Sequence, residues 1–519
     1  MTSFASAPPC RETHAPAAEP PVLDVALIGA GAVGCALARE LSYEQLEVAV
    51  FESEPDVGSG TSKANSGIVH AGFDAAPGSL MARLNVAGAA LMPGLCRDLD
   101  IPYTQNGSLV LAFDKVDIPR LEELAARGRA NGVEALEVID QERLRQLEPQ
   151  VSPEAVAALW APTAGIVDPF LLCVAQAEVA ADNGVRFHLS EPMEQVHWLN
   201  ASHPATSQEA QAISLGARWR VATAQGSYFC RCVAAAAGLF SADLYNPWVD
   251  EDQKLEITPR RGSYYLLDIS AQPAPRHTLF QLPGPKGKGV LVTPTTHGNT
   301  LVGPTAVDVD DPEATCTSAA ELAAIAQLAR QSFPELDLKA TITSFAGLRA
   351  HEAGHEFVIR EVAPGYVHAA GIESPGLTAS PAIALLMKEM LGTQLRYVAK
   401  EQPVRTRKGP VKTRELSCDE LACLVEAQPA FGEIICRCEQ ISAGEILDAC
   451  SRSIPVTTTD GVKRRVRAGM GRCQGGFCLP RVIELVAQAA SLPQEAVGKN
   501  SPDAPWITGI DKEGFSWRQ

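Results

Sequence analysis

Hydrophobic and polar positions near the start of the chain predict one strand–helix–strand unit. An apolar run at 25–28 precedes a glycine-rich turn, residues 35–41 have helical spacing, and a second apolar run at 48–51 leads to an acidic residue. Parallel strands need a crossover connection, so two buried strands joined by a helix are typical of a parallel sheet. The pattern therefore predicts a βαβ unit over residues 22–51.

Beyond this unit the pattern predicts further helices and a second sheet. Apolar residues recur at helical spacing in 80–99 and 118–130. The strand-like stretches are residues 107–113, 183–187, 228–237, 257–267 and 289–307. Alternation in the last two stretches, with Pro- and Gly-rich turns between them, predicts an antiparallel sheet.

Composition narrows the class of protein. At 519 residues the chain exceeds what one hydrophobic core normally covers, so we expect two or three domains. A net charge of -17 argues against a nucleic-acid binder, and no apolar run reaches the roughly 18 residues of a membrane span. The first 22 residues lack the features of a secretory signal. With 14 cysteines, we therefore expect a reducing, cytoplasmic location.

The glycine-rich turn has the spacing of a dinucleotide-binding fingerprint. Gly29 permits a tight turn, Gly31 allows the backbone to approach a pyrophosphate, and Gly34 allows the helix to pack on the strand. Glu52 follows the second strand, where its carboxylate can accept hydrogen bonds from ribose hydroxyls. NAD and FAD share this fingerprint, so the turn alone leaves the cofactor open.

The loop after Glu52 favours FAD. Residues 58–70 are rich in glycine and hydroxyl side chains, which suit a second phosphate and the edge of a flavin. The segment resembles the FAD-dependent oxidoreductases of the D-amino-acid oxidase and glycerol-3-phosphate dehydrogenase superfamily, and the resemblance covers residues 23–395. The FAD contacts that it implies in this loop are Thr61, Ser62, Asn65, Ser66 and Gly67.

Two later motifs extend the resemblance. Residues 234–239 resemble the strand end that contacts the adenine side of FAD, with alanine where Asn or Thr is common. Residues 371–378 resemble the C-terminal flavin loop, where a helix N-terminus at the pyrimidine end of the ring would stabilise the anionic reduced flavin. The implied FAD contacts are Gly238, Gly371, Gly376 and Leu377.

The resemblance also implies a substrate pocket. Arg349 stands where the family places an arginine against a carboxylate or phosphate, although a solvent-exposed arginine is the alternative. His70 lies in a stretch similar to that of glycerol-3-phosphate and L-2-hydroxyglutarate dehydrogenases, close to the isoalloxazine. Oxidising an alcohol needs a base for the hydroxyl proton, so His70 is either that base or a structural histidine.

Four further residues are candidates for the pocket. Arg261 and Tyr264 lie in a stretch that resembles the start of the substrate sheet, where they either contact substrate or brace the sheet. His351 and His355 follow Arg349 closely, and either can reach the mouth of the pocket. The sequence does not rank the two histidines.

Four cysteines in two close pairs, Cys436-x-Cys438 and Cys473-x4-Cys478, predict a metal or cluster site. The four cysteines could hold a [2Fe-2S] cluster, a zinc ion or no metal. Cysteine pairs that bind zinc usually have C-x2-C spacing, which favours the cluster. Residues 469–478 resemble the bacterioferritin-associated ferredoxin type of [2Fe-2S] domain, which implies these four cysteines as ligands. Glycines there would let the loop wrap a cluster and aim amide N–H groups at sulfur.

Two other features are read as structural. Cys230 and Cys232 lie on an apolar strand without a second pair at cluster spacing, so we predict packed interior thiols. The basic cluster at 463–467 could dock an acidic electron carrier, bind an anion or offset the charge of the iron-sulfur cluster. A solvated face is the favoured interpretation.

These observations predict a mixed α/β and α+β fold with three functional parts. They are a Rossmann-like FAD domain, an antiparallel-sheet substrate domain and a small C-terminal [2Fe-2S] domain. The expected boundaries are a disordered tail at 1–22, an oxidoreductase domain at 23–395, a linker at 396–430 that is basic over 396–414, the [2Fe-2S] domain at 431–490 and a C-terminal segment at 491–519. Within the oxidoreductase domain, FAD-binding parts are expected at 23–95, 150–255 and 345–395, and substrate-binding parts at 96–149 and 256–344.

The combination implies an FAD-dependent dehydrogenase that oxidises a small anionic hydroxy compound. Glycerol 3-phosphate, oxidised to dihydroxyacetone phosphate, is the preferred substrate, and electrons would pass through the [2Fe-2S] cluster to a one-electron acceptor protein or a quinone-linked subunit. Alternatives are L-2-hydroxyglutarate, another 2-hydroxy acid or an amino acid as substrate, a flavin and iron-sulfur electron-transfer protein, and an oxidase with an inert cluster. Peripheral membrane association through a partner is compatible with this expectation.

Overall fold

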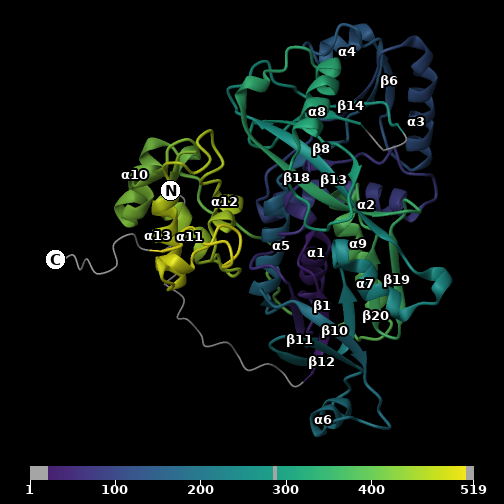
Figure 1. The fold of residues 1–519 in the computed structure, drawn as a ribbon, viewed down its shortest axis with the longest axis vertical. Helices are drawn as coiled ribbons and strands as arrows, with labels where there is room; N and C mark the ends of the chain where they lie inside the picture. Colours follow the sequence, from purple (N-terminus) through teal and green to yellow (C-terminus); the bar gives the residue numbers. More distant parts are fainter. Residues whose placement is uncertain (1–21, 285–288, 510–519) are drawn as a thin grey trace.

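The computed structural model describes residues 22–284 and 289–509, so the predicted tail at 1–22 lies outside it except for Val22. Two sheets form the larger part of the molecule, and the small helical domain near the end of the chain lies beside them (Figure 1). None of the helices in the described ranges is long and apolar enough to cross a membrane.

The first sheet contains the predicted βαβ unit. It has eight strands in the order β10-β11-β12-β1-β2-β9, with β20 beside β12 and β19 beside β20. Their bounds are β1 (Leu23–Ile28), β2 (Val48–Phe51), β9 (Arg186–His188), β10 (Met193–Trp198), β11 (Trp219–Thr223), β12 (Gly226–Ala235), β19 (Val358–Ala363) and β20 (Tyr366–Ala370). β1 is parallel to both β2 and β12, which confirms the parallel pairing expected from the sequence.

Helices cover this sheet and bury its central strands. Helix α1 (Ala32–Leu41) packs between α5 (Pro169–Asp182) and α9 (Gly376–Leu391). Strand β1 is buried almost throughout because neighbours lie on both faces. Its near-continuous apolar run, rather than an alternating one, follows from burial on both faces of a parallel sheet. A further helix, α2 (Leu80–Leu99), packs against α9.

The second sheet has nine strands in the order β17-β13-β16-β15-β14-β5-β7-β6, with β18 beside β13. Their bounds are β5 (Ser108–Ala112), β6 (Glu137–Asp140), β7 (Ala157–Ala161), β13 (Ile257–Leu267), β14 (Thr278–Gln281), β15 (Leu291–Pro294), β16 (Thr300–Gly303), β17 (Val307–Asp308) and β18 (Thr341–Glu352). All of its pairings are antiparallel except β5 with β14. The predicted antiparallel sheet is therefore present, and one parallel pair joins its early and late strands.

Helices and a small third sheet complete this region. Helix α8 (Ala319–Ser332) packs on β13 and β16, while α3 (Ile118–Ala130) and α4 (Gln141–Leu147) pack near β7. β3 (Ile68–Val69), β8 (Gly165–Val167) and β4 (Tyr103–Thr104) form a three-stranded sheet. β7 and β18 belong to the second sheet, although all of β7 and most of β18 fall within the ranges expected to bind FAD.

The cysteine module folds around a core of its own. Its elements are α10 (Cys418–Ala427), β21 (Ile434–Cys436), β22 (Ile441–Ser442), α11 (Ala443–Cys450), α12 (Thr459–Val466) and α13 (Leu479–Ala490). Ile446, Val462 and Val486 are completely buried in this core. Helix α10 lies inside the range expected to be a linker, and a capping box between Ser417 and Glu420 stabilises its first turn.

Buried charge pairs join this module to the loop that follows β2 of the first sheet. Arg465 of α12 donates to both carboxylate oxygens of Asp56, at 2.7 and 2.8 Å, and both side chains are buried. Arg464 donates to Ser59 at 2.8 Å. The favoured prediction of a solvated face for the basic cluster at 463–467 is therefore wrong, because its two central arginines dock onto the loop after β2.

A second set of contacts joins the module to the second sheet. Arg467 donates to Asn299 at 3.1 Å, and Arg472 forms an ion pair with Asp268 at 3.3 Å. Because the module contacts both sheets, its position relative to each of them is fixed by polar groups of definite geometry.

His368 in β20 gives the protein a predictable dependence of stability on pH. Burial lowers the pKa of this histidine to about 3. The unfolded chain binds a proton near the ordinary histidine pKa of about 6.5, whereas the folded chain does not, so stability falls as the pH drops below 6.5. We expect a loss of roughly 2 kcal/mol between pH 6.5 and 5.0 from this residue. Chemical denaturation of the wild-type protein and of His368→Gln at both pH values measures it. Equal losses in the two proteins would contradict the assignment.

Candidate active site and cysteine cluster

One large cavity lies between the two sheets. Its volume is about 1700 Å³, larger than the roughly 300–1,000 Å³ of a typical small-ligand pocket, so it has room for a dinucleotide and a substrate together. The predicted site residues that line it are His70, Arg349, Tyr264, His355, Gly29, Gly31, Glu52, Thr61, Ser62, Asn65, Ser66, Gly238, Gly376 and Leu377. The structure thus brings together residues from distant parts of the chain.

The glycine-rich turn is shaped for a phosphate at the start of α1. Gly29 has a φ of 93°, and a Cβ there would lie 2.6 Å from the backbone oxygen of Ala236. A Cβ on Gly34 would lie 1.9 Å from the oxygen of Gly29, so the close packing of helix on strand requires glycine. Gly31 precedes the helix without a side-chain cap and lines the cavity. The first turn of α1 therefore offers backbone N–H groups to an anion.

Glu52 places a carboxylate where the fingerprint requires one. Its two oxygens accept hydrogen bonds from the backbone N–H groups of Ala30, at 2.7 Å, and Glu54, at 3.0 Å. Burial raises the pKa of this carboxyl above its ordinary value, although these hydrogen bonds oppose the shift. The carboxylate is held at the cavity wall, with geometry that suits a ribose.

The loop at 58–67 is fixed by its own hydroxyl and amide groups. Ser62 accepts from the N–H of Ala32 at 3.0 Å, and Thr61 donates to the backbone oxygen of Leu348 at 2.7 Å. Asn65 accepts from the N–H of Gly67 at 2.8 Å, and Gly67 lies behind the cavity wall. The loop therefore connects α1 to β18 and has the backbone shape of a cofactor cradle. These observations fit FAD.

His70 follows β3 and is held by α9. The backbone N–H of His70 donates to the hydroxyl of Thr378 at 3.0 Å, and this hydroxyl in turn donates to the backbone oxygen of Ile68 at 3.1 Å. The imidazole Nε2 lies 3.4 Å from the hydroxyl of Ser374, and its ring centroid lies 5.9 Å from that of Phe280. The backbone bond to Thr378 and the neighbouring Phe280 ring fix the position of His70, and Nε2 can exchange a proton with a ligand that takes the place of Ser374.

Arg349 and Tyr264 lie on neighbouring strands of the cavity wall. Arg349 on β18 donates to the backbone oxygen of Thr305 at 2.6 Å and has no carboxylate partner among the described residues. Tyr264 on β13 is buried, stacks on Phe345 and has a pKa raised by burial. The remaining donors of the Arg349 guanidinium are available to an anion in the cavity.

The two arginines at the start of β13 point in opposite directions. Arg261 lies away from the cavity and donates to Glu321 at 2.6 Å. Arg260 lines the cavity and pairs with both oxygens of Asp308, at 2.5 and 3.1 Å. Sequence reasoning named Arg261 and missed Arg260. Side chains of a strand alternate between its faces, so Tyr264 shares a face with Arg260, four residues away. This alternation could have identified Arg260 from the sequence.

The loop before α9 closes one side of the cavity. Gly376 and Leu377 line it, whereas Gly371 lies behind it with a φ of 64°. The start of α9 has no side-chain cap and lies at the cavity wall, so the positive end of the helix dipole is close to the cavity. Glu373 of this loop also lines the cavity. Sequence reasoning did not single it out.

The four predicted ligand cysteines come together in the small domain. Cys438 and Cys473 have their sulfur atoms 3.5 Å apart, and a hydrogen bond from Cys478 lowers the pKa of Cys436 to about 6. A Cβ on Gly471 would lie 2.4 Å from the Cβ of Cys438, so a glycine is required beside the ligand loop. Convergence of four sulfur atoms from two short loops fits a [2Fe-2S] cluster.

Backbone groups support the second cysteine pair. Burial opposes ionisation of Cys473, but hydrogen bonds from Cys438 and from the backbone of Phe477, Gly475 and Gly476 hold its pKa below the ordinary value. Cys436 and Cys478 are buried, whereas Cys438 is exposed, so the cluster site has one inner and one outer edge. Cys230 and Cys232 are completely buried in the first sheet, which confirms their prediction as packed thiols.

Comparison with known proteins supports both the FAD site in the cavity and the cluster site in the small domain. Residues 24–390 match the family described as FAD dependent oxidoreductase, and residues 434–488 match the BFD-like [2Fe-2S] binding domain. The chain is 42% identical over 494 residues to a glycerol 3-phosphate dehydrogenase of Caloramator mitchellensis, covering 95% of this chain and 99% of that protein. It is 32% identical over 294 residues to the mitochondrial L-2-hydroxyglutarate dehydrogenase of Caenorhabditis elegans, covering 55% and 64%.

A solved structure shares the fold of the larger part. The dithionite-reduced L-alpha-glycerophosphate oxidase of Mycoplasma pneumoniae, with FAD bound, matches with a TM-score of 0.68 and 30% identity, covering 75% of this chain and 100% of that one. The family match spans more than half of the chain and the cavity carries its fingerprint. The chain therefore belongs to the FAD-dependent oxidoreductase family, with FAD and a [2Fe-2S] cluster as its cofactors.

Proposed function

We propose that this protein is a glycerol-3-phosphate dehydrogenase that passes electrons to a one-electron acceptor. The observation that carries the proposal is the presence of His70 and Arg349 in the wall of one cavity beside the FAD fingerprint. Similarity to the Caloramator enzyme over nearly the whole of both chains, including the cysteine module, supports it.

The charges of the cavity favour a substrate with one anionic group. Arg260 and Arg349 are the only arginines among its described lining residues, and no lysine is among them. Asp308 already neutralises Arg260. Within the described part of the cavity wall Arg349 is therefore the main site for an anion, which matches the single phosphate of glycerol 3-phosphate better than the two carboxylates of L-2-hydroxyglutarate.

The proposed chemistry assigns one task to each residue. Arg349 binds the phosphate through its fork of N–H donors, and this contact orients the secondary alcohol. His70 takes the hydroxyl proton at Nε2, where the substrate hydroxyl replaces the 3.4 Å contact of that nitrogen with Ser374, while the backbone bond to Thr378 holds the residue in place. FAD, when bound, would accept the hydride from the carbon that carries this hydroxyl group. The [2Fe-2S] cluster would pass the electrons on one at a time. The apolar ring of Phe280 at the cavity wall limits access of water.

We also propose that the acceptor docks at the outer edge of the cluster site. Cys438 is exposed, and Phe477 beside Cys478 is 85% exposed, so this edge can be reached from solvent. The acceptor is a small electron-carrier protein or a quinone-linked subunit, and the protein acts in the cytoplasm, with peripheral membrane association through that subunit as the second option.

Anaerobic absorbance of the intact protein tests the proposal. Glycerol 3-phosphate is expected to bleach the flavin band and then to reduce the cluster, whereas L-2-hydroxyglutarate and amino acids leave both unchanged. Cys473→Ser is the matched variant, which should keep the flavin response and lose the cluster signal. Reduction of the flavin by L-2-hydroxyglutarate and not by glycerol 3-phosphate would show that L-2-hydroxyglutarate is the substrate. Reduction by NADH alone would identify an electron-transfer protein, and rapid peroxide formation in air would identify an oxidase.

A further inference from the structure

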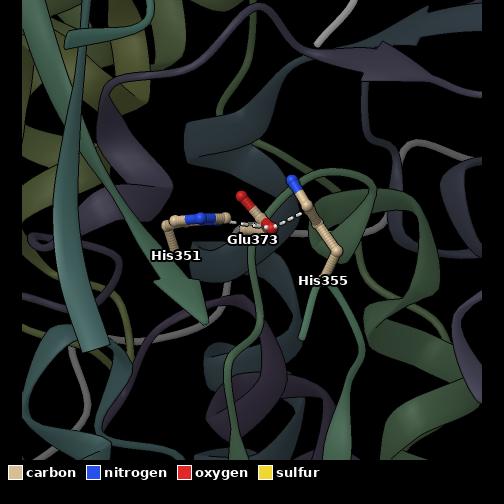
Figure 2. A group of neighbouring side chains, drawn as sticks. All are labelled: His351, His355 and Glu373. Carbon is tan, nitrogen blue, oxygen red and sulfur yellow. Dashed lines mark hydrogen bonds and ion pairs between the residues drawn. The ribbon is translucent and has the colours of Figure 1, made fainter. Parts of the chain in front are cut away.

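A compact group of three side chains, two of which line the cavity, takes no part in the proposed reaction. His351 is near the end of β18, His355 follows in the next turn, and Glu373 belongs to the loop before α9. The carboxylate of Glu373 lies between the two imidazoles (Figure 2). Nδ1 of His351 lies 3.0 Å from Glu373 Oε1, and Nδ1 of His355 lies 2.8 Å from the same oxygen.

The three side chains converge on one point. One ligand atom from each residue lies within 4.8 Å of the other two, and both imidazoles approach a single carboxylate oxygen. In a tetrahedral zinc site with bonds of about 2.0–2.1 Å, neighbouring ligand atoms are about 3.3 Å apart. The observed separations to Oε1 therefore need to open by only a few tenths of an ångström to admit an ion.

The backbone around the group is fixed before any ion binds. The N–H of His355 donates to the backbone oxygen of Glu352 at 3.0 Å, and the N–H of Gly354 donates to the Glu352 carboxylate at 2.7 Å. On the other side, the N–H of Glu373 donates to the oxygen of Gly371 at 3.0 Å. A Cβ on Gly371 would lie 2.9 Å from the Cβ of Glu352, so glycine permits the two segments to approach. This support is of the kind that orients metal ligands.

We propose that His351, His355 and Glu373 form a binding site for a divalent transition-metal ion of the zinc class. Two imidazoles and one carboxylate suit zinc, and they disfavour magnesium and calcium, which prefer oxygen ligands throughout. His351 and Glu373 are buried, whereas the side chain of His355 is 59% exposed. His355 and Glu373 also line the cavity. A fourth coordination position therefore remains open to water or to a small anion.

The site differs in ligand type from the cysteine cluster, and this difference makes it testable. Zinc bound here has only nitrogen and oxygen neighbours at about 2.0–2.2 Å, whereas zinc on cysteine has sulfur at about 2.3 Å. We would add one equivalent of zinc chloride to the protein with FAD and its iron-sulfur cluster in place, and record the zinc X-ray absorption spectrum. A shell of nitrogen and oxygen with two imidazoles is expected. A sulfur shell, or no bound zinc, would overturn the proposal.

Variants assign the ion to these residues. His355→Ala removes the most exposed ligand and is expected to weaken zinc binding at least tenfold in a calorimetric titration, while the flavin spectrum stays intact. His351→Gln, read out by the same titration, is the second variant should the first fail to fold. His203→Ala removes an exposed histidine elsewhere and serves as the matched control. Unchanged affinity in His355→Ala, or an equal loss in His203→Ala, would refute the assignment.

Discussion

Replacement of Arg349 by methionine is expected to lower kcat/KM for glycerol 3-phosphate by roughly a hundred- to a thousand-fold, since hydrogen bonds to a charged group are worth about 1.5–3 kcal/mol each. Methionine keeps much of the side-chain volume and removes all of the N–H donors. The loss should appear mainly in KM if the phosphate contact is equal in ground and transition states, and in kcat as well if the contact orients the alcohol. Anaerobic rapid mixing with the substrate measures both quantities.

Two further variants make this result specific. Arg349→Lys keeps the charge and loses the planar fork, so its activity should lie between those of the wild-type protein and the methionine variant. Arg143→Met removes an exposed arginine on α4 and should leave kcat/KM unchanged. A wild-type kcat/KM in Arg349→Met would show that the phosphate binds elsewhere in the cavity.

Replacement of Asp56 by asparagine is expected to lower the free energy that holds the cysteine module in its folded, docked state by about 3–5 kcal/mol. This is the usual cost of leaving a buried charge without its partner. Arg465 would keep its charge in a site where its side chain is 1% exposed. The module should then unfold at a lower temperature than the FAD-binding part, and hydrogen exchange in α12 should accelerate. Reduction of the cluster after the flavin should also slow, because the docked position is populated less.

A paired replacement separates this explanation from general damage. Asp56→Leu combined with Arg465→Met replaces both charges by apolar groups and should recover much of the stability, as buried pairs elsewhere do. Glu484→Gln breaks the solvent-exposed pair with Arg481 and should produce no measurable change. If Asp56→Asn behaves like Glu484→Gln, the buried pair does not hold the module in place.

Local patterns were sufficient to predict the elements that are regular. The apolar run of β1, the glycines of the turn and the helical spacing of α2 and α3 each reflect a requirement that neighbouring residues impose on one another. The cysteine spacing was sufficient for the same reason, since two short loops supply all four sulfur atoms. The FAD cradle could be predicted because nearly all of its chemistry is backbone geometry.

Contacts between distant segments could not be predicted. Arg465 and Asp56 are 409 positions apart, and nothing in the basic run itself shows that a buried carboxylate lies opposite two of its members. The same holds for Glu373, whose position beside His351 depends on the approach of two segments 22 residues apart. Choosing Arg260 over Arg261 needed only strand parity, but applying it required knowledge of which face of β13 is buried.

The docking of α12 on the loop after β2 also bears on how the protein can be divided. That loop leads directly from Asp56 to Ser59, Thr61 and Ser62, so the side that faces away from the FAD cradle is covered by Arg464 and Arg465. A recombinant flavin domain ending before the cysteine module would expose Asp56 to water and leave this loop without its cover. Truncation is therefore expected to yield a protein that loses FAD on dilution, and iron supply during expression would influence flavin content as well as cluster content.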